Sequence, residues 1–186
     1  MRVLVVHPPL SVARDFIDYP YHADLGAVQL AAVLAERGFA VELADAFALD
    51  GSTLVWRPDG RAHLGAPVDE LLARARDGTD CAVVAYSPFH RPPARDDVLA
   101  AVLAGLRARL GGAPIVLADV YQSGQHYVEA DGAQVLAAYP EADAWVKYEG
   151  EVTVPALIDA LAHDERPAGV VRGAEVPALD ALPPPA

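Results

Sequence analysis

Short apolar runs alternate along this chain with longer segments whose apolar residues recur at helical spacing. The first run, Val3 to Val6, is continuously apolar, which is typical of a strand covered on both faces. Parallel neighbouring strands need a crossover connection, and a helix between successive strands supplies it. The alternation therefore predicts an α/β domain built on a parallel sheet. The expected strands are 3–6, 39–43, 81–86, 114–118 and 144–146.

Helices are expected between these strands, and right-handed crossovers would bring all the strand carboxyl ends to one edge, where such sheets bind ligands. Residues 48–66 form an insertion, because two apolar runs flank the turn signal Pro58-Asp59-Gly60 and predict a small hairpin near 50–65. The expected helices are 25–37, 67–76, 94–110, 128–138 and 152–162.

Charge and cysteine content exclude several functions. The chain of 186 residues suits one domain, and its net charge of −12 leaves no basic stripe, so we expect neither nucleic acid nor a membrane surface as a partner. No apolar run approaches the ~18 residues that a membrane span needs. Cys81 is the only cysteine, so the chain cannot form an internal disulfide or hold an iron–sulfur cluster by itself. A single cysteine fits a cytoplasmic location.

Five segments resemble, in order, the cobalamin (vitamin B12)-binding domain that precedes many radical S-adenosylmethionine (SAM) enzymes. They are the opening strand with its Pro-Pro turn (2–9), the first helix (24–34), the second strand (38–46), the Glu-Gly-Glu run (148–157) and the closing Leu-Asp-Ala-Leu-Pro (179–183). The resemblance implies a Rossmann- or flavodoxin-like three-layer sandwich with a five-stranded parallel sheet in the order 2-1-3-4-5. It also implies a cobalamin-binding domain at 1–173 and a Pro-rich linker at 174–186 leading toward a catalytic barrel.

In such proteins the nucleotide tail of cobalamin inserts at the strand ends. The chemistry, often methyl transfer, belongs to a separate barrel that holds an iron–sulfur cluster and S-adenosylmethionine. A CxxxCxxC cluster motif is absent here, so we expect the chain not to be catalytic alone. The resemblance and the loop positions give these cofactor-binding candidates: Pro8, Pro9, Leu10, Tyr21, His22, Ser87, Pro88, Phe89, Asp119, Val120, Tyr121, Gln122, Glu149, Gly150 and Glu151.

Several of these segments have a second interpretation. Family members often carry glycines where this chain has 119–122, and the larger side chains favour an alternative, a degenerate scaffold or interaction domain without cofactor. The carboxylates of 149–151 could instead cap the following helix. The aromatic loop 19–22 either lines a flat macrocycle or packs on the first helix. Lys147, the only lysine, is expected to pair with Glu149 or with a ligand phosphate.

Three histidines follow strands that are adjacent in the implied order. His7, His90 and His126 come after the first, third and fourth strands. Imidazoles gathered on one edge could supply an axial ligand to cobalt or form a small metal site. A third interpretation is therefore a small metal-binding enzyme that uses these three residues. Solvated loop histidines would give the same pattern.

Overall fold

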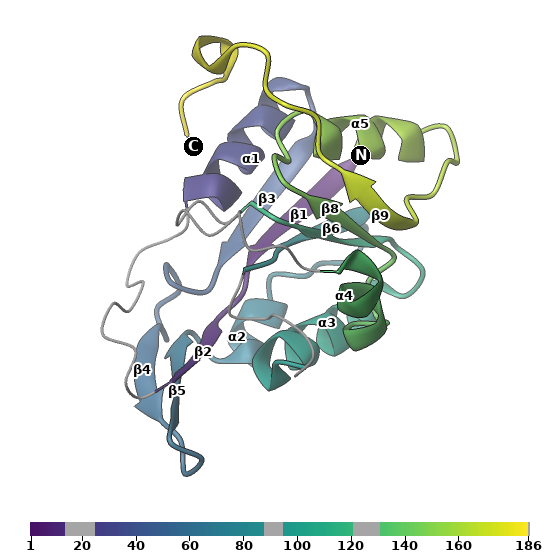
Figure 1. Ribbon diagram of the computed structural model, residues 1–186. Coiled ribbons are helices and arrows are strands. Elements are labelled where there is room, and N and C mark those ends of the chain that lie inside the picture. Colours follow the sequence, from purple (N-terminus) through teal and green to yellow (C-terminus); the bar gives the residue numbers. More distant parts are fainter. Residues whose placement is uncertain (14–24, 88–94, 121–130, 186) are drawn as a thin grey trace.

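The computed structural model describes residues 1–13, 25–87, 95–120 and 131–185. A six-stranded sheet lies at its centre, and all neighbouring strands in this sheet are parallel (Figure 1). The first five strands stand in the predicted order 2-1-3-4-5, which is the flavodoxin-like order. From edge to edge the strands are β3 (Ala40–Asp45), β1 (Arg2–His7), β6 (Cys81–Ala85), β7 (Ile115–Ala118), β8 (Ala144–Lys147) and β9 (Gly169–Arg172).

The sixth strand, β9, corrects the predicted count of five. It pairs along its whole length with β8, from Gly169 opposite Ala144 to Arg172 opposite Lys147. As an edge strand it is covered on one side only, and none of its four residues is fully buried. The other strands were predicted from continuous apolar runs. A short, half-exposed strand does not need such a run, so no sequence pattern indicated β9.

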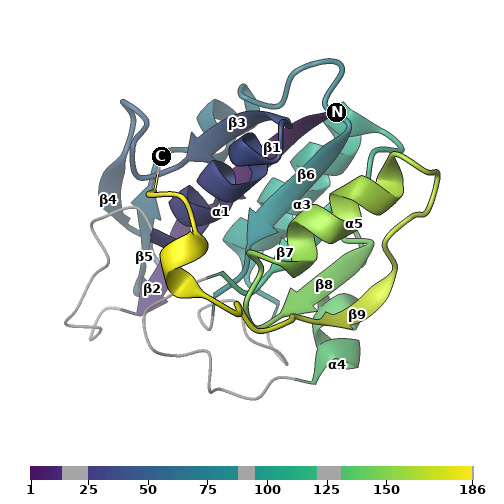
Figure 2. The ribbon, with the colours of Figure 1, turned by 90° about the horizontal axis from the view of Figure 1, so that it is seen from above.

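Helices cover both faces of the sheet and confirm the three-layer sandwich. Figure 2 shows α1 (Leu25–Glu36) and α5 (Thr153–Leu161) side by side on one face. The other face carries α2 (Val68–Leu72), α3 (Asp97–Leu110) and α4 (Gly132–Ala138). None of the described helices is long and apolar enough to cross a membrane.

One crossover departs from the right-handed expectation. The crossovers β6-α3-β7 and β8-α5-β9 both move one strand in the same direction across the sheet. Their helices α3 and α5 cover opposite faces of the sheet, so the two crossovers have opposite hands. Right-handed crossovers are the strong rule for parallel strands. Here α5 buries Val154 and Ile158 against β7 and β8 on the face that α1 covers elsewhere. The carboxyl end of β9 still reaches the common edge.

The predicted hairpin is present and belongs to a second, three-stranded sheet. Its strands β4 (Thr53–Trp56) and β5 (Arg61–Gly65) are antiparallel, as expected. β2 (Leu10–Ala13) adds to the other side of β5, in a segment for which the sequence predicted neither a strand nor a helix. Leu10 and Val12 of β2 are buried against Ala62. A long-range partner, rather than local pattern, makes this segment a strand.

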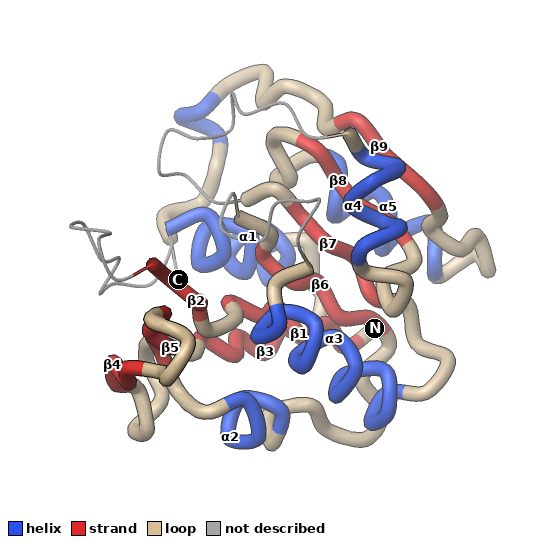
Figure 3. The backbone as a smooth tube through the Cα atoms, turned by 60° about the horizontal axis from the view of Figure 1, so that its bottom comes forward, coloured by secondary structure: helices blue, strands red, loops and turns tan. Residues whose placement is uncertain are grey.

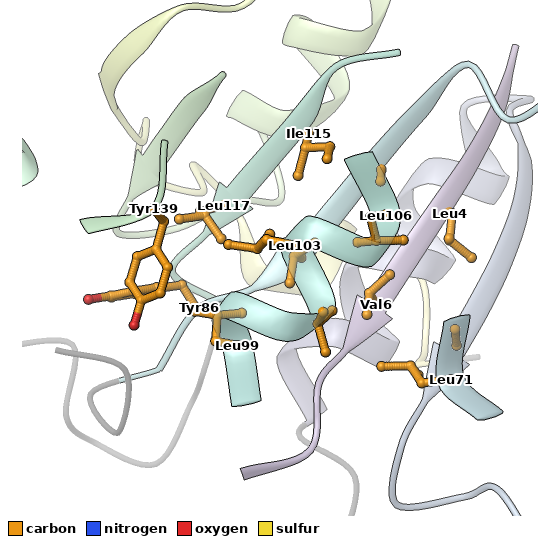
Figure 4. Close-up of a cluster of buried hydrophobic side chains, with 14 of the residues drawn as sticks. Leu4, Val6, Leu71, Tyr86, Leu99, Leu103, Leu106, Ile115, Leu117 and Tyr139 are labelled. Carbon is orange, nitrogen blue, oxygen red and sulfur yellow. The ribbon is translucent and has the colours of Figure 1, made fainter. Parts of the chain in front are cut away.

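The larger core cluster lies between the sheet and α3 (Figure 4). Leu99, Leu103 and Leu106 recur at spacings of four and three, so they share one helix face, and each is at most 1% exposed. Asp96 caps this helix and accepts hydrogen bonds from the backbone N–H groups of Val98 and Leu99. Burial raises the pKa of the Asp96 carboxyl.

Cys81 should be chemically inert in the folded protein. Its side chain is fully buried, and burial raises the pKa of the thiol to about 12. Because the thiolate is the reactive form, we expect negligible reaction with a disulfide reagent at about pH 8, and complete reaction in denaturant. Absorbance of the released chromophore gives the rate. Rapid labelling of the folded protein would contradict the burial of this strand.

Candidate functional site

A cavity of about 580 Å³ opens at the carboxyl edge of the large sheet. Four chain segments that are distant in sequence form its walls, and two of them contain residues predicted for cofactor binding. Its lining residues come from the start of α1 (Leu25 and Gln29), the end of β7 (Asp119 and Val120), the loop from β8 to α5 (Tyr148, Glu149 and Glu151) and the C-terminal segment (Val176, Leu179, Leu182 and Pro183).

A buried ion pair ties together the two strands beneath the cavity. Lys147 Nζ lies 2.7 Å from Asp119 Oδ2, and the two side chains are only 9% and 6% exposed. The Asp119 backbone N–H also donates to the carbonyl of Val146. The expected pairing of Lys147 with Glu149 is wrong, because Lys147 and Asp119 directly follow Val146 and Ala118, which are partners in the parallel register of β8 and β7. The ammonium also lies 4.7 Å from the ring centre of Tyr148.

The loop after β8 places two carboxylates at the cavity. Tyr148 adopts a positive φ of 71°, an uncommon conformation for a residue with a side chain, and turns the chain sharply. Gly150 follows, and a Cβ there would come within 2.9 Å of Val120. A glycine is therefore needed for the loop to pack against the end of β7. Glu151 is 8% exposed, and no described residue donates a hydrogen bond to its carboxylate.

Helix capping by these carboxylates is not what the structure shows. The N-cap residue, which precedes α5, is Val152, and no side chain makes a cap hydrogen bond there. The carboxylate of Glu149 instead accepts a hydrogen bond from the backbone N–H of Val176, at 2.7 Å. The capping interpretation is therefore wrong, and Glu149 anchors the C-terminal segment.

The C-terminal segment 174–185 lies against the domain and forms one wall of the cavity. Figure 3 shows it running from β9 toward α1. The N–H of Ala174 donates to Thr153 Oγ1, and Gln29 Nε2 donates to the carbonyl of Pro183, each at 2.8 Å. The segment contains one 3₁₀ turn, Leu179–Ala181. Its predicted role as a linker toward a further domain remains a prediction.

His7, at the end of β1, is engaged with β3. Its Nδ1 lies 3.0 Å from Asp45 Oδ1, its ring stacks on Phe47, and it is 2% exposed. Nε2 is buried without a hydrogen-bond partner. No group of three potential metal ligands occurs among the described residues, and His90 and His126 lie outside them. The three-histidine metal site therefore remains a prediction.

The remaining candidates lie at the same edge without lining the cavity, or lie outside the described residues. Pro8, Pro9 and Leu10 follow β1 and are buried, and Ser87 lies just after β6. The candidates outside the described residues are Tyr21, His22, Pro88, Phe89, Tyr121 and Gln122.

Sequence reasoning missed the α1 and C-terminal walls. Gln29 did give a signal, as a polar residue within the otherwise apolar run of α1. Gln29 is only 8% exposed, it lines the cavity, and its amide donates to the C-terminal segment. Leu179 and Leu182 gave no comparable signal, because their Pro-rich surroundings are typical of a linker.

Comparison with known proteins adds little to this picture. No protein-family model matches the chain, and no curated protein matches it. A flavodoxin-like domain of a Synechococcus sp. protein of solved structure is 16% identical, covers 96% of this chain and 86% of its own, and has a TM-score of 0.39. At this score the likeness supports no further argument. The flavodoxin-like assignment rests on the strand order.

Proposed function

We propose that this domain binds cobalamin at the carboxyl edge of its sheet and presents it to a radical SAM catalytic domain or partner. The observation that carries the proposal is the position of the cavity. Ligands of open parallel sheets bind outside the strand carboxyl ends. Four of the cofactor-binding residues expected from the sequence line this cavity, namely Asp119, Val120, Glu149 and Glu151.

The size and lining of the cavity fit part of the cofactor. Small-molecule pockets typically measure about 300–1,000 Å³ and are mostly apolar with a few polar groups. Leu25, Val120 and Leu182 suit the flat benzimidazole ring of the nucleotide tail. The carboxylates suit the N–H groups of the cofactor's amide side chains. They do not suit its phosphodiester, because the only lysine is already paired with Asp119.

In this proposal the chain binds and orients the cofactor, while another domain performs the reaction. Cobalamin supplies a cobalt centre that can carry a methyl group. The residues of the chain would enclose the benzimidazole end of the nucleotide tail and exclude water from it, and the phosphodiester of the tail would lie outside the carboxylate-lined cavity. The iron–sulfur cluster and S-adenosylmethionine would belong to the partner, since Cys81 is the only cysteine and is buried.

Hydroxocobalamin provides the direct test. Purified protein should retain it through gel filtration and shift its visible spectrum at micromolar protein. Leu25→Trp adds bulk at the cavity mouth and should weaken binding about fivefold or more, equivalent to roughly 1 kcal/mol. Val55→Trp is the matched control, because Val55 is 50% exposed on β4 and does not line the cavity. Absence of binding by a cooperatively folded protein would refute the proposal.

A scaffold domain without cofactor is the second candidate. It is favoured by the C-terminal segment, which puts the chain's own Leu179, Leu182 and Pro183 along one side of the cavity. Such a domain would use the carboxyl edge for packing rather than binding. Gln29→Ala removes the hydrogen bond to Pro183. If this variant also fails to take up hydroxocobalamin, the scaffold interpretation is favoured.

A further inference from the structure

Glu151 is the one carboxylate of the cavity lining that lacks a hydrogen-bond donor among the described residues. It lies on the loop between β8 and α5, lines the cavity and is 8% exposed. Asp119 accepts from Lys147, and Glu149 accepts from the N–H of Val176. Buried polar groups in folded proteins almost always have a partner. The carboxylate of Glu151 therefore faces the cavity with its acceptor capacity unused by the described residues, where a donor from water or from a ligand can reach it.

We infer that the carboxylate of Glu151 selects its ligand by accepting a hydrogen bond from an N–H group. The rest of this ligand would be apolar and about the size of an aromatic ring system. The inference rests on the proposed function, because it takes the cavity to be the ligand site. In cobalamin the matching donors would be the primary carboxamides. Neutral amides, amines and N–H heterocycles share this chemistry.

The charges around the cavity support a donor and disfavour an anion. Asp119, Glu149 and Glu151 bring three carboxylates to the lining. Lys147, which lies beneath the cavity in the described part of the chain, forms an ion pair with Asp119. Arg172 lies over the outer ring of Tyr148, 4.9 Å from its centre, and is not a lining residue. No Lys or Arg is among the described lining residues, so a carboxylate or phosphate placed inside the cavity would face these carboxylates, whereas an N–H group there would be a charge-assisted donor.

A pair of small probes isolates the N–H group. Benzimidazole carries a ring N–H, and 1-methylbenzimidazole replaces it with a methyl group on the same ring. At about pH 8, ligand-observed NMR should show that the wild-type chain binds benzimidazole about tenfold more tightly, as expected for a hydrogen bond to a charged group. Equal affinities, or no binding of either probe, would overturn the inference.

Substitution of Glu151 tests whether this residue is the acceptor. Glu151→Met keeps the length of the side chain and removes the acceptor, so the preference should fall to about twofold or less. Glu151→Gln keeps an uncharged acceptor and should give an intermediate preference. Glu36→Gln is the control, because Glu36 is exposed at the far end of α1. A full preference retained in Glu151→Met would overturn the inference.

Hydroxocobalamin separates this inference from the proposed function. If the probe preference depends on Glu151 but hydroxocobalamin does not bind, the donor inference stands and the cobalamin proposal fails. If hydroxocobalamin binds equally to wild type and Glu151→Met, and the probes show no preference, the cobalamin proposal stands and the inference fails.

Discussion

Replacing Lys147 by Met should lower the free energy of unfolding by about 3–5 kcal/mol, the range for removing one partner of a buried ion pair. Lys147 Nζ and Asp119 Oδ2 are 2.7 Å apart, and both side chains are almost fully buried. The substitution leaves the Asp119 carboxylate in an apolar environment without this cation. Because the pair joins the ends of β7 and β8, we also expect weaker ligand binding at the cavity. Urea unfolding followed by circular dichroism measures the stability change.

Two further variants identify the cause of that loss. Arg37→Met removes an exposed ion pair, in which the side chains of Arg37 and Asp159 are 51% and 55% exposed. This substitution should lower the free energy of unfolding by less than about 1 kcal/mol. The double variant Lys147→Met/Asp119→Leu replaces the buried pair with apolar groups and should recover most of the stability. A Lys147→Met loss no larger than that of Arg37→Met would show that the buried pair is not important for folding.

Replacing Trp145 by Ala should lower the free energy of unfolding by about 3–5 kcal/mol, because it leaves a large cavity in the core. Trp145 on β8 is 1% exposed and meets the ring of Tyr86 edge-on, with ring centres 5.6 Å apart. It also lies next to Gly132 at the start of α4, where a Cβ would come within 3.1 Å of the indole. The loss should therefore include the contact between α4 and the sheet. Thermal and urea unfolding would both report it.

Trp145→Phe separates packing from hydrogen bonding at this position. The indole Nε1 is buried without a hydrogen-bond partner, so its removal relieves a desolvated donor while most of the ring is kept. We expect Trp145→Phe to cost clearly less than Trp145→Ala. Trp56→Ala is the exposed control, at 49% exposure on β4, and should cost less than about 1 kcal/mol. Equal losses for Phe and Ala would indicate a hydrogen bond to the indole.

The central strands were predictable from the sequence because local pattern alone specifies them. Val3–Val6 and the apolar stretch from Cys81 are buried on both faces, so each reads as a continuous apolar run. α3 was equally clear, since its leucines recur on one face and Gly111 ends it. The strand order also followed from the resemblance, and the carboxyl edge from the parallel arrangement of the strands. These features depend mainly on residues close together in sequence.

The features that only the tertiary structure decided depend on partners far along the chain. β2 is a strand because β5 lies beside it, and β9 is a strand because β8 does. Lys147 pairs with Asp119, 28 residues away, rather than with its neighbour Glu149. The Pro-rich segment that resembles a linker forms a wall of the cavity. It is held there by a hydrogen bond from Gln29 to the carbonyl of Pro183, 154 residues away. Sequence pattern determined which residues are buried in the sheet. Long-range contacts determined which polar residues meet at its edge, because neither spacing nor composition encodes the distance between segments so far apart.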